Sequence, residues 1–200
     1  ASGAELASAV ELAVIASGLA VAKSGTATVT AGEIRSAGTA SRPMSAPILF
    51  ERDAIADQVR KWRAAGLRVG FTNGCFDILH PGHLSLLEQA SARCDRLVVA
   101  INSDASVSRL KGPSRPVNTE LDRARLLSGL SAVDAVTLFE EDTPAEIIAQ
   151  LIPDLLVKGG DYRLEDIVGA ETVKAAGGEV LIVPLVDGQS TTGIIARSTH

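Results

Sequence analysis

Aromatic residues and cysteine are scarce in this sequence. Phe, Trp and Tyr together make up 3% of the 200 residues, although hydrophobic residues reach 46%. The core must therefore be built from Val, Leu, Ile and Ala, and the length suffices for one α/β domain with a real core. Two cysteines, far apart in the chain, exclude a disulfide framework and predict the reducing environment of the cytoplasm.

The sequence also lacks an excess of basic residues. Its 19 Lys and Arg against 24 Asp and Glu give a formal net charge of −5, so we expect neither nucleic acid nor a membrane surface as a partner. A signal peptide is not expected either, because Glu5 and Glu11 lie where its basic residues would be. The apolar stretch at residues 12–22 is too short for a membrane span.

Histidine is rare as well, and two of the three histidines, His80 and His83, lie close together, whereas His200 is the last residue. An apolar run at residues 67–71 predicts a buried strand before them, and residues 84–92 predict a helix after them. Pro81 suits the first turn of that helix. A spacing of three places both imidazoles on one face at the helix start.

The histidine pair allows three interpretations. A zinc site would need further ligands, but no third histidine is near and Cys75 and Cys94 form no close pair. The two rings can also be simple polar caps. Beside free backbone N–H groups at a helix start, imidazole donors can instead stabilise charge on a phosphoryl group. The strand–turn–helix context favours phosphate chemistry.

Apolar stretches alternate with helical patterns along the rest of the chain. Strands are expected at residues 67–71, 96–101, 135–139, 154–158 and 179–183. Helices are expected at residues 50–65, 84–92, 121–130, 143–151 and 164–176, and a last one is expected to be capped by Ser190 or Thr191. This alternation predicts an α/β fold with a doubly wound, five-stranded parallel sheet, similar to a Rossmann fold.

In such a sheet, ligands bind beyond the carboxyl ends of the strands, where the strand order reverses. The candidates for binding a nucleotide and its phosphates are therefore Thr72, Asn73, Gly74, Phe76 and Asp77 after the first strand, Lys158, Gly159 and Asp161 after the fourth, and Ser190, Thr191 and Thr192 after the fifth. The last two groups can also be an ordinary turn and a helix cap. Residues 140–142 are acidic and would repel phosphate, so we expect them away from the site.

The link between residues 102 and 119 carries a cluster of cations. Arg109, Lys111 and Arg115 fall within seven residues, and Gly112 and Pro113 interrupt the segment, so we expect a loop rather than a helix. A solvated cationic loop is one interpretation. We favour phosphate contact, because Arg and Lys bind phosphate in different ways, with the loop closing over the substrate.

Residues 73–83 read NGCFDILHPGH, and this string resembles the HxGH signature of the nucleotidylyltransferase superfamily in its cytidylyltransferase-like branch. Other segments are similar to the adenylyltransferase domains of bacterial ADP-heptose synthases. They are NSDAS at 102–106, RLKG at 109–112, RPVN at 115–118, LLVKGGDY at 155–162 and STTGII at 190–195.

The resemblance implies an enzyme that transfers AMP from ATP to D-glycero-β-D-manno-heptose 1-phosphate and releases pyrophosphate, for lipopolysaccharide core synthesis. The residues implied to contact the reacting phosphates as catalytic groups are His80, His83 and Lys111. Those assigned to the acceptor are Asp104, Arg109 and Arg115. Mg²⁺ is expected on the triphosphate, with Asp77 as the candidate protein ligand.

Residues 1–40 resemble the C-terminal end of a ribokinase-like sugar kinase, which precedes the nucleotidylyltransferase domain in bifunctional heptose enzymes. The ATP and sugar sites of such a kinase would lie upstream, in a kinase domain missing from this chain, so no kinase activity is expected. Residues 41–49, in a stretch rich in Ser, Ala and Pro, are expected to be a linker. Residues 50–200 are expected to form the nucleotidylyltransferase domain.

Two other functions stay open at this point. One is a cytidylyltransferase for glycerol 3-phosphate or a similar phospho-alcohol, since a base pocket made by backbone and shape leaves little trace in sequence. The other is a non-catalytic nucleotide-binding module, although the retention of the histidines, the cations and the hydroxyl-rich turn argues against it. A dinucleotide oxidoreductase is not expected, because the G-x-G-x-x-G turn is missing. Assembly into a homo-oligomer is left open.

Overall fold

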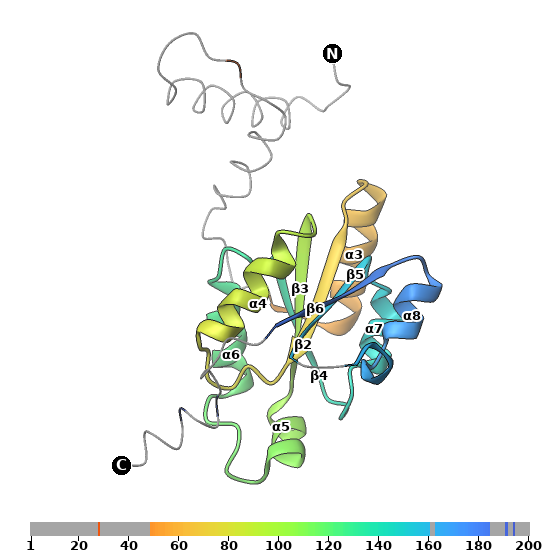
Figure 1. The fold of residues 1–200 in the computed structure, drawn as a ribbon. Coiled ribbons are helices and arrows are strands. Elements are labelled where there is room, and N and C mark those ends of the chain that lie inside the picture. The colour runs from red at the N-terminus through yellow and green to blue at the C-terminus, as the bar shows by residue number, and fades with distance from the viewer. Residues whose placement is uncertain (1–27, 29–48, 161–162, 185–190, 192–193, 195–200) are drawn as a thin grey trace. The chain divides into compact units, whose positions relative to one another are not determined.

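The computed structural model describes residues 28, 49–160, 163–184, 191 and 194. The chain divides into two units, residues 1–46 and 47–200, and the fold of the second is shown in Figure 1. The predictions for residues 1–40 and for the linker up to residue 48 lie outside the described residues, as do Asp161, Ser190 and Thr192.

The centre of the fold is a parallel sheet of six strands in the order β1-β4-β3-β2-β5-β6. The strands are β1 (Leu49–Phe50), β2 (Val69–Gly74), β3 (Arg96–Asn102), β4 (Ala135–Phe139), β5 (Leu155–Gly159) and β6 (Glu179–Val183). The five predicted strands are confirmed. The two-residue β1, which pairs with β4 at the edge, adds a sixth strand that was not predicted.

Helices cover both faces of the sheet (Figure 1). They are α3 (Arg52–Ala64), α4 (Pro81–Ser91), α5 (Asp104–Lys111), α6 (Glu120–Ser128), α7 (Ala145–Leu151) and α8 (Ala170–Ala175), with a 3₁₀ turn, η1, at Leu164–Asp166. Along β3, Val98 and Ala100 belong to the core under α3, α7 and α8. Leu97, Val99 and Ile101 alternate with them and belong to the core under α4 and α6. This alternation, with both faces apolar, is what a buried parallel strand requires.

The prediction of a loop from residue 102 to residue 119 is wrong, because α5 occupies the first half of this segment. The hydroxyl of Ser103 caps the helix by accepting a hydrogen bond of 3.2 Å from the Ser106 N–H. Gly112, with φ of 98°, ends it. The glycine and proline therefore end a helix rather than prevent one. Arg109 and Lys111 lie in its last turn.

The predicted helix over residues 164–176 is also wrong in its extent, because Gly169 separates η1 from α8. Its φ of 86° is left-handed, and a Cβ at this position would lie 2.7 Å from Ile148 of α7. The close contact between α7 and this turn therefore requires glycine. The helix expected over residues 143–151 begins later, at Ala145, with Pro144 as its N-cap residue and no side-chain cap.

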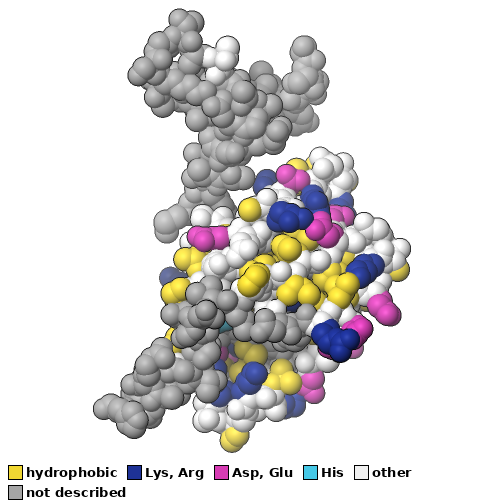
Figure 2. Space-filling model, viewed as in Figure 1, with side chains coloured by type: hydrophobic (Ala, Val, Ile, Leu, Met, Phe, Trp, Pro, Cys, Tyr) yellow, Lys and Arg dark blue, Asp and Glu magenta, His cyan; other side chains and the backbone are white. Residues whose placement is uncertain are grey.

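The strand order reverses at β2. The chain runs outward from β2 through β3 to β4 and then returns to β5 on the other side of β2, which is the arrangement that opens a crevice at the carboxyl ends of β2 and β5. Lys and Arg side chains are interspersed with Asp and Glu on the face shown in Figure 2. No helix in the described ranges is both long enough and apolar enough to cross a membrane.

Candidate active site

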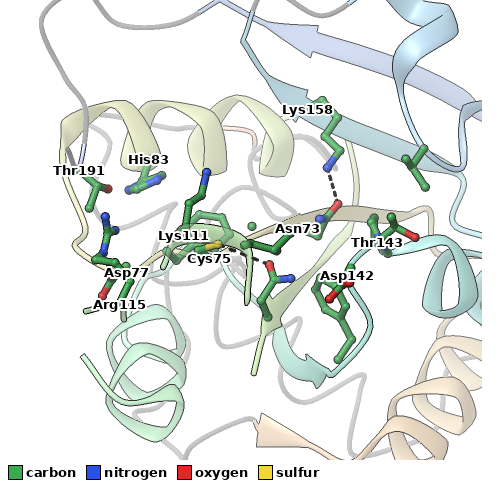
Figure 3. A pocket seen from close by; sticks show the side chains of 17 residues that line it. Asn73, Cys75, Asp77, His83, Lys111, Arg115, Asp142, Thr143, Lys158 and Thr191 are labelled. Atoms are coloured by element: carbon green, nitrogen blue, oxygen red, sulfur yellow. Dashed lines mark hydrogen bonds and ion pairs between the residues drawn. The ribbon is translucent and has the colours of Figure 1, made fainter. Parts of the chain in front are cut away.

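A cavity of about 470 Å³ lies at the carboxyl ends of β2, β3, β4 and β5. Its lining residues come from segments far apart in sequence (Figure 3). They are Asn73, Gly74, Cys75, Phe76, Asp77, His83, Asn102, Leu110, Lys111, Arg115, Phe139, Asp142, Thr143, Pro144, Lys158, Val168 and Thr191. The cavity is therefore located where the reversal of strand order predicts a ligand site.

The histidine pair stands at the start of α4. His80 is the N-cap residue and Pro81 the first helical residue, so His83 comes one turn later and lines the cavity. The two rings stack with centroids 3.8 Å apart, and Phe76 packs against His83 at 4.9 Å. His80 is absent from the cavity lining, so it contacts the site through its stacking on His83.

Burial keeps both imidazoles neutral near pH 7. Loss of water around the ring, together with the neighbouring His80, lowers the pKa of His83 to about 4. Burial also lowers the pKa of His80. The Nδ1 atoms of both rings are buried without a hydrogen-bond partner among the described residues. Each neutral ring still has one N–H group, and a donor at the N-terminal end of α4 suits an anionic ligand.

Asp77 anchors the segment that carries Arg115. Its carboxylate forms an ion pair with Arg115 and accepts hydrogen bonds from the N–H groups of Val117 at 2.7 Å and Asn118 at 3.1 Å. Burial alone would raise the pKa of Asp77, but these hydrogen bonds and the guanidinium charge lower it. Its oxygens are therefore bound within the protein, although Asp77 also lines the cavity.

Lys158 and Asn73 meet at the point where the strand order reverses. The Lys158 ammonium at the end of β5 donates a hydrogen bond of 2.6 Å to the Asn73 side-chain oxygen at the end of β2. Burial lowers the pKa of Lys158 to about 8, so the side chain is still mostly charged at neutral pH. This pair places a partly desolvated cation at the position expected for a nucleotide.

Arg123 holds the surrounding loops together, and the sequence analysis missed it. Its fully buried guanidinium donates to the backbone oxygens of Cys75 at 2.6 Å and Asn118 at 3.1 Å, and pairs with Asp104 at 2.7 Å. Only its position in the helix could have predicted its burial, because Arg123 lies beside Ala124 and near Leu127 on the buried side of α6. Asp104, expected to bind the acceptor, is engaged by Arg123 and is absent from the cavity lining.

Three other predicted residues also lie off the cavity lining. Thr72 is fully buried within β2. Gly159 packs near Leu86, which a Cβ would approach to 3.4 Å. Arg109 pairs with Asp142 at 2.9 Å on the exposed side of α5. By contrast, Thr191 does line the cavity, and its hydroxyl donates to the Ile78 backbone oxygen at 3.4 Å.

The expectation that residues 140–142 lie away from the site is wrong. Asp142 and the neighbouring Phe139, Thr143 and Pro144 line the cavity, because β4 lies directly beside β3 in the sheet. Cys75 and Asn102 line it as well. The cavity thus contains two cations, Lys111 and Arg115, beside the neutral ring of His83, and a separate wall at the end of β4.

Comparison with known proteins gives a consistent set of similarities. The family model described as cytidylyltransferase-like matches residues 71–197. The bifunctional protein HldE of Hyphomonas neptunium is 62% identical over 99% of this chain, and that of Caulobacter vibrioides is 54% identical over 98%. The chain spans 41% of the length of each of these relatives. A crystal structure of the lipopolysaccharide core biosynthesis protein from Thermoplasma volcanium aligns with a TM-score of 0.49 at 30% identity, covering 62% of this chain and 100% of that one.

We expect Arg123→Met to lower the free energy of unfolding by about 3 kcal/mol, because it removes a buried charge and leaves its partners unpaired. Urea unfolding followed by circular dichroism measures this change. Arg125→Met on the exposed side of the same helix is the matched control and should change stability by about 0.5 kcal/mol or less. Equal losses for the two variants would show that the guanidinium contacts contribute nothing.

We also expect acid to destabilise the protein through His83. Its folded-state pKa of about 4 lies below the ordinary value, so between these two values only the unfolded chain takes up the proton. Stability is complete above pH 6.5 and falls as the pH decreases towards 4. His83→Gln should remove on the order of 1–2 kcal/mol of the stability difference between pH 7.5 and pH 5, allowing for partial exposure of the ring. Parallel pH dependences for parent and variant would contradict this assignment.

Proposed function

The chain belongs to the cytidylyltransferase-like family, with a match over residues 71–197, and we propose that it transfers AMP from ATP to D-glycero-β-D-manno-heptose 1-phosphate. The products are ADP-heptose and pyrophosphate, for lipopolysaccharide core synthesis. The acceptor is that of the ADP-heptose synthases that the sequence resembles. The observation that carries the proposal is that His83, Lys111 and Thr191, far apart in sequence, line one cavity.

The proposed chemistry needs positioning rather than a strong base. A phosphate monoester has a second pKa of about 6, so the acceptor oxygen is already charged at neutral pH. This oxygen attacks the α-phosphorus of ATP while the bond to the bridging oxygen of the β-phosphate breaks, and pyrophosphate leaves with the bonding electrons. A ring with the low pKa of His83 is a poor base at pH 7 but a suitable hydrogen-bond donor to the reacting phosphate.

The cations of the cavity would hold the two anionic substrates together. Lys111 and Arg115 lie on the same side of the cavity as His83, whereas Lys158 lies beside Asn73 (Figure 3). We assign Lys158 and Asn73 to the nucleotide, because they stand where the strand order reverses. We also propose that four further residues contact the nucleotide phosphates, as the resemblance implies: Asp161, Ser190, Thr191 and Thr192.

Mg²⁺ is proposed to arrive with the ATP phosphates. Within the part of the chain that the structure describes, no three His, Cys, Asp or Glu side chains gather in a way that could hold a metal ion. The Asp77 carboxylate is taken up by Arg115, Val117 and Asn118. The residues present therefore do not fit a metal site made by the protein alone.

Residues 1–40 are proposed to be the end of a ribokinase-like domain, residues 41–49 a linker and residues 50–200 the adenylyltransferase domain. The chain's 41% share of its relatives' length is compatible with this division. We propose a cytoplasmic location, where ATP and sugar phosphates are available.

We expect the purified chain to release pyrophosphate from ATP when D-glycero-β-D-manno-heptose 1-phosphate is present, and to use CTP poorly. His83→Ala should lower kcat by about 100-fold or more, because a donor to the transition state is lost. Lys61→Ala on the exposed side of α3 is the control and should leave kcat unchanged. A coupled pyrophosphate assay measures all three proteins.

Equal rates for His83→Ala and the parent would remove His83 from the chemistry. Faster turnover with CTP and glycerol 3-phosphate would indicate the cytidylyltransferase alternative. Calorimetric binding of ATP without turnover of any sugar phosphate or phospho-alcohol would indicate a nucleotide-binding module instead.

A further inference from the structure

The wall of the cavity at the end of β4, here the β4 wall, has a chemistry unlike the rest of the site. It consists of Phe139, Asp142, Thr143 and Pro144. Phe139 and Pro144 are buried, whereas Asp142 and Thr143 are exposed to solvent at the cavity. Figure 3 shows Asp142 and Thr143 at the opposite end of the cavity from His83, Lys111 and Arg115. A carboxylate and a hydroxyl next to two buried apolar residues are thus set apart from Lys111 and Arg115.

The Asp142 carboxylate is held in place by the helix that carries Lys111. Its Oδ1 lies 2.9 Å from the Arg109 Nε, and Arg109 also donates to the Glu140 backbone oxygen at 2.5 Å. Both side chains of the pair are at least half exposed, at 50% for Arg109 and 60% for Asp142. The pair fixes the loop while the carboxylate keeps its access to water and to a ligand.

This wall is poorly suited to phosphate but well suited to a sugar. A carboxylate repels phosphate, whereas it accepts strong, charge-assisted hydrogen bonds from hydroxyl groups. The Thr143 hydroxyl can both donate and accept. Phe139 and Pro144 add apolar atoms to the cavity lining here, and both are largely buried. A polyhydroxylated, uncharged group is the ligand that satisfies all these features.

The sheet order separates this wall from the place proposed for the nucleotide. Lys158 and Asn73 stand at β5 and β2, where the order reverses, and β4 is the second strand from β2 on the other side. Two strand spacings of about 4.8 Å amount to roughly 10 Å. A sugar on the β4 wall can therefore direct its phosphate towards Lys111 while the nucleotide occupies the region around β5.

We infer that the β4 wall binds the hydroxyl groups of the acceptor sugar, with Asp142 and Thr143 as determinants of acceptor specificity. The inference rests on the proposed function for the identity of the acceptor. It gives a function to the Asp142 carboxylate, which would repel both of the reacting phosphate groups.

The test compares Asp142→Asn and Thr143→Val with the parent chain, using D-glycero-β-D-manno-heptose 1-phosphate and ATP as probes. Loss of one charge-assisted hydrogen bond should raise KM for the sugar phosphate by about 10-fold or more, with KM for ATP changed less than about twofold. Two controls separate other causes. Glu140→Gln alters an exposed carboxylate beside the wall and should raise KM for the sugar phosphate by no more than about threefold. Arg109→Gln removes the ion pair while keeping Asp142, and it should raise this KM less than Asp142→Asn does.

Calorimetric titration with the same sugar phosphate gives a readout that does not need turnover. Binding that is about 10-fold weaker for Asp142→Asn supports the inference, even if the parent chain forms no product. Failure of the parent to form product would refute the proposed function but not the inference. Turnover with an unchanged acceptor KM would overturn the inference and leave the proposed function standing. A raised KM for ATP instead would assign the wall to the nucleotide. An Arg109→Gln effect equal to that of Asp142→Asn would show that the carboxylate acts only by holding the loop.

Discussion

The buried guanidinium of Arg123 is the contact on which the site depends. It joins the Cys75 backbone after β2, the Asn118 backbone before α6, and Asp104 at the start of α5. The ion pair between Asp77 and Arg115 also joins the segment after β2 to the segment before α6. Since α5 carries Lys111 and the segment after β2 leads to His83, these polar contacts fix the distance between the two groups proposed to meet the reacting phosphates. A buried cation is costly unless its partners are placed well, so the geometry of the three loops is closely specified.

Burial also sets the charge state of the site. His83 and Lys158 both have lowered pKa values because water is excluded around them, so His83 is neutral at pH 7 whereas Lys158 remains mostly charged. An anionic ligand would raise both values and favour the protonated forms. Binding of phosphate and uptake of protons should therefore be linked. The carboxylate of Asp142, at the other end of the cavity, remains available to neutral hydroxyl groups.

The fold was predictable from local patterns, and the site was predictable only in part. Apolar runs predicted the five long strands, and the segment from Asn73 to His83 predicted the centre of the site. The helix α5 was missed because Gly112 and Pro113, which end it, were taken to break the whole segment. The β4 wall was missed because a charge argument alone placed residues 140–142 elsewhere. Arg123 was missed because an arginine in an amphipathic helix is ordinarily exposed.

The sequence by itself determined the alternation of strands and helices, the parallel sheet and the histidine pair at a helix start, because each of these depends on residues close together in the chain. Tertiary structure alone decided the strand order, and with it that the ends of β4 and β5 share one cavity with His83. It also decided that Asp77, Asp104 and Arg109 are engaged by protein groups. Such pairings form between segments distant in sequence, so no local pattern records them.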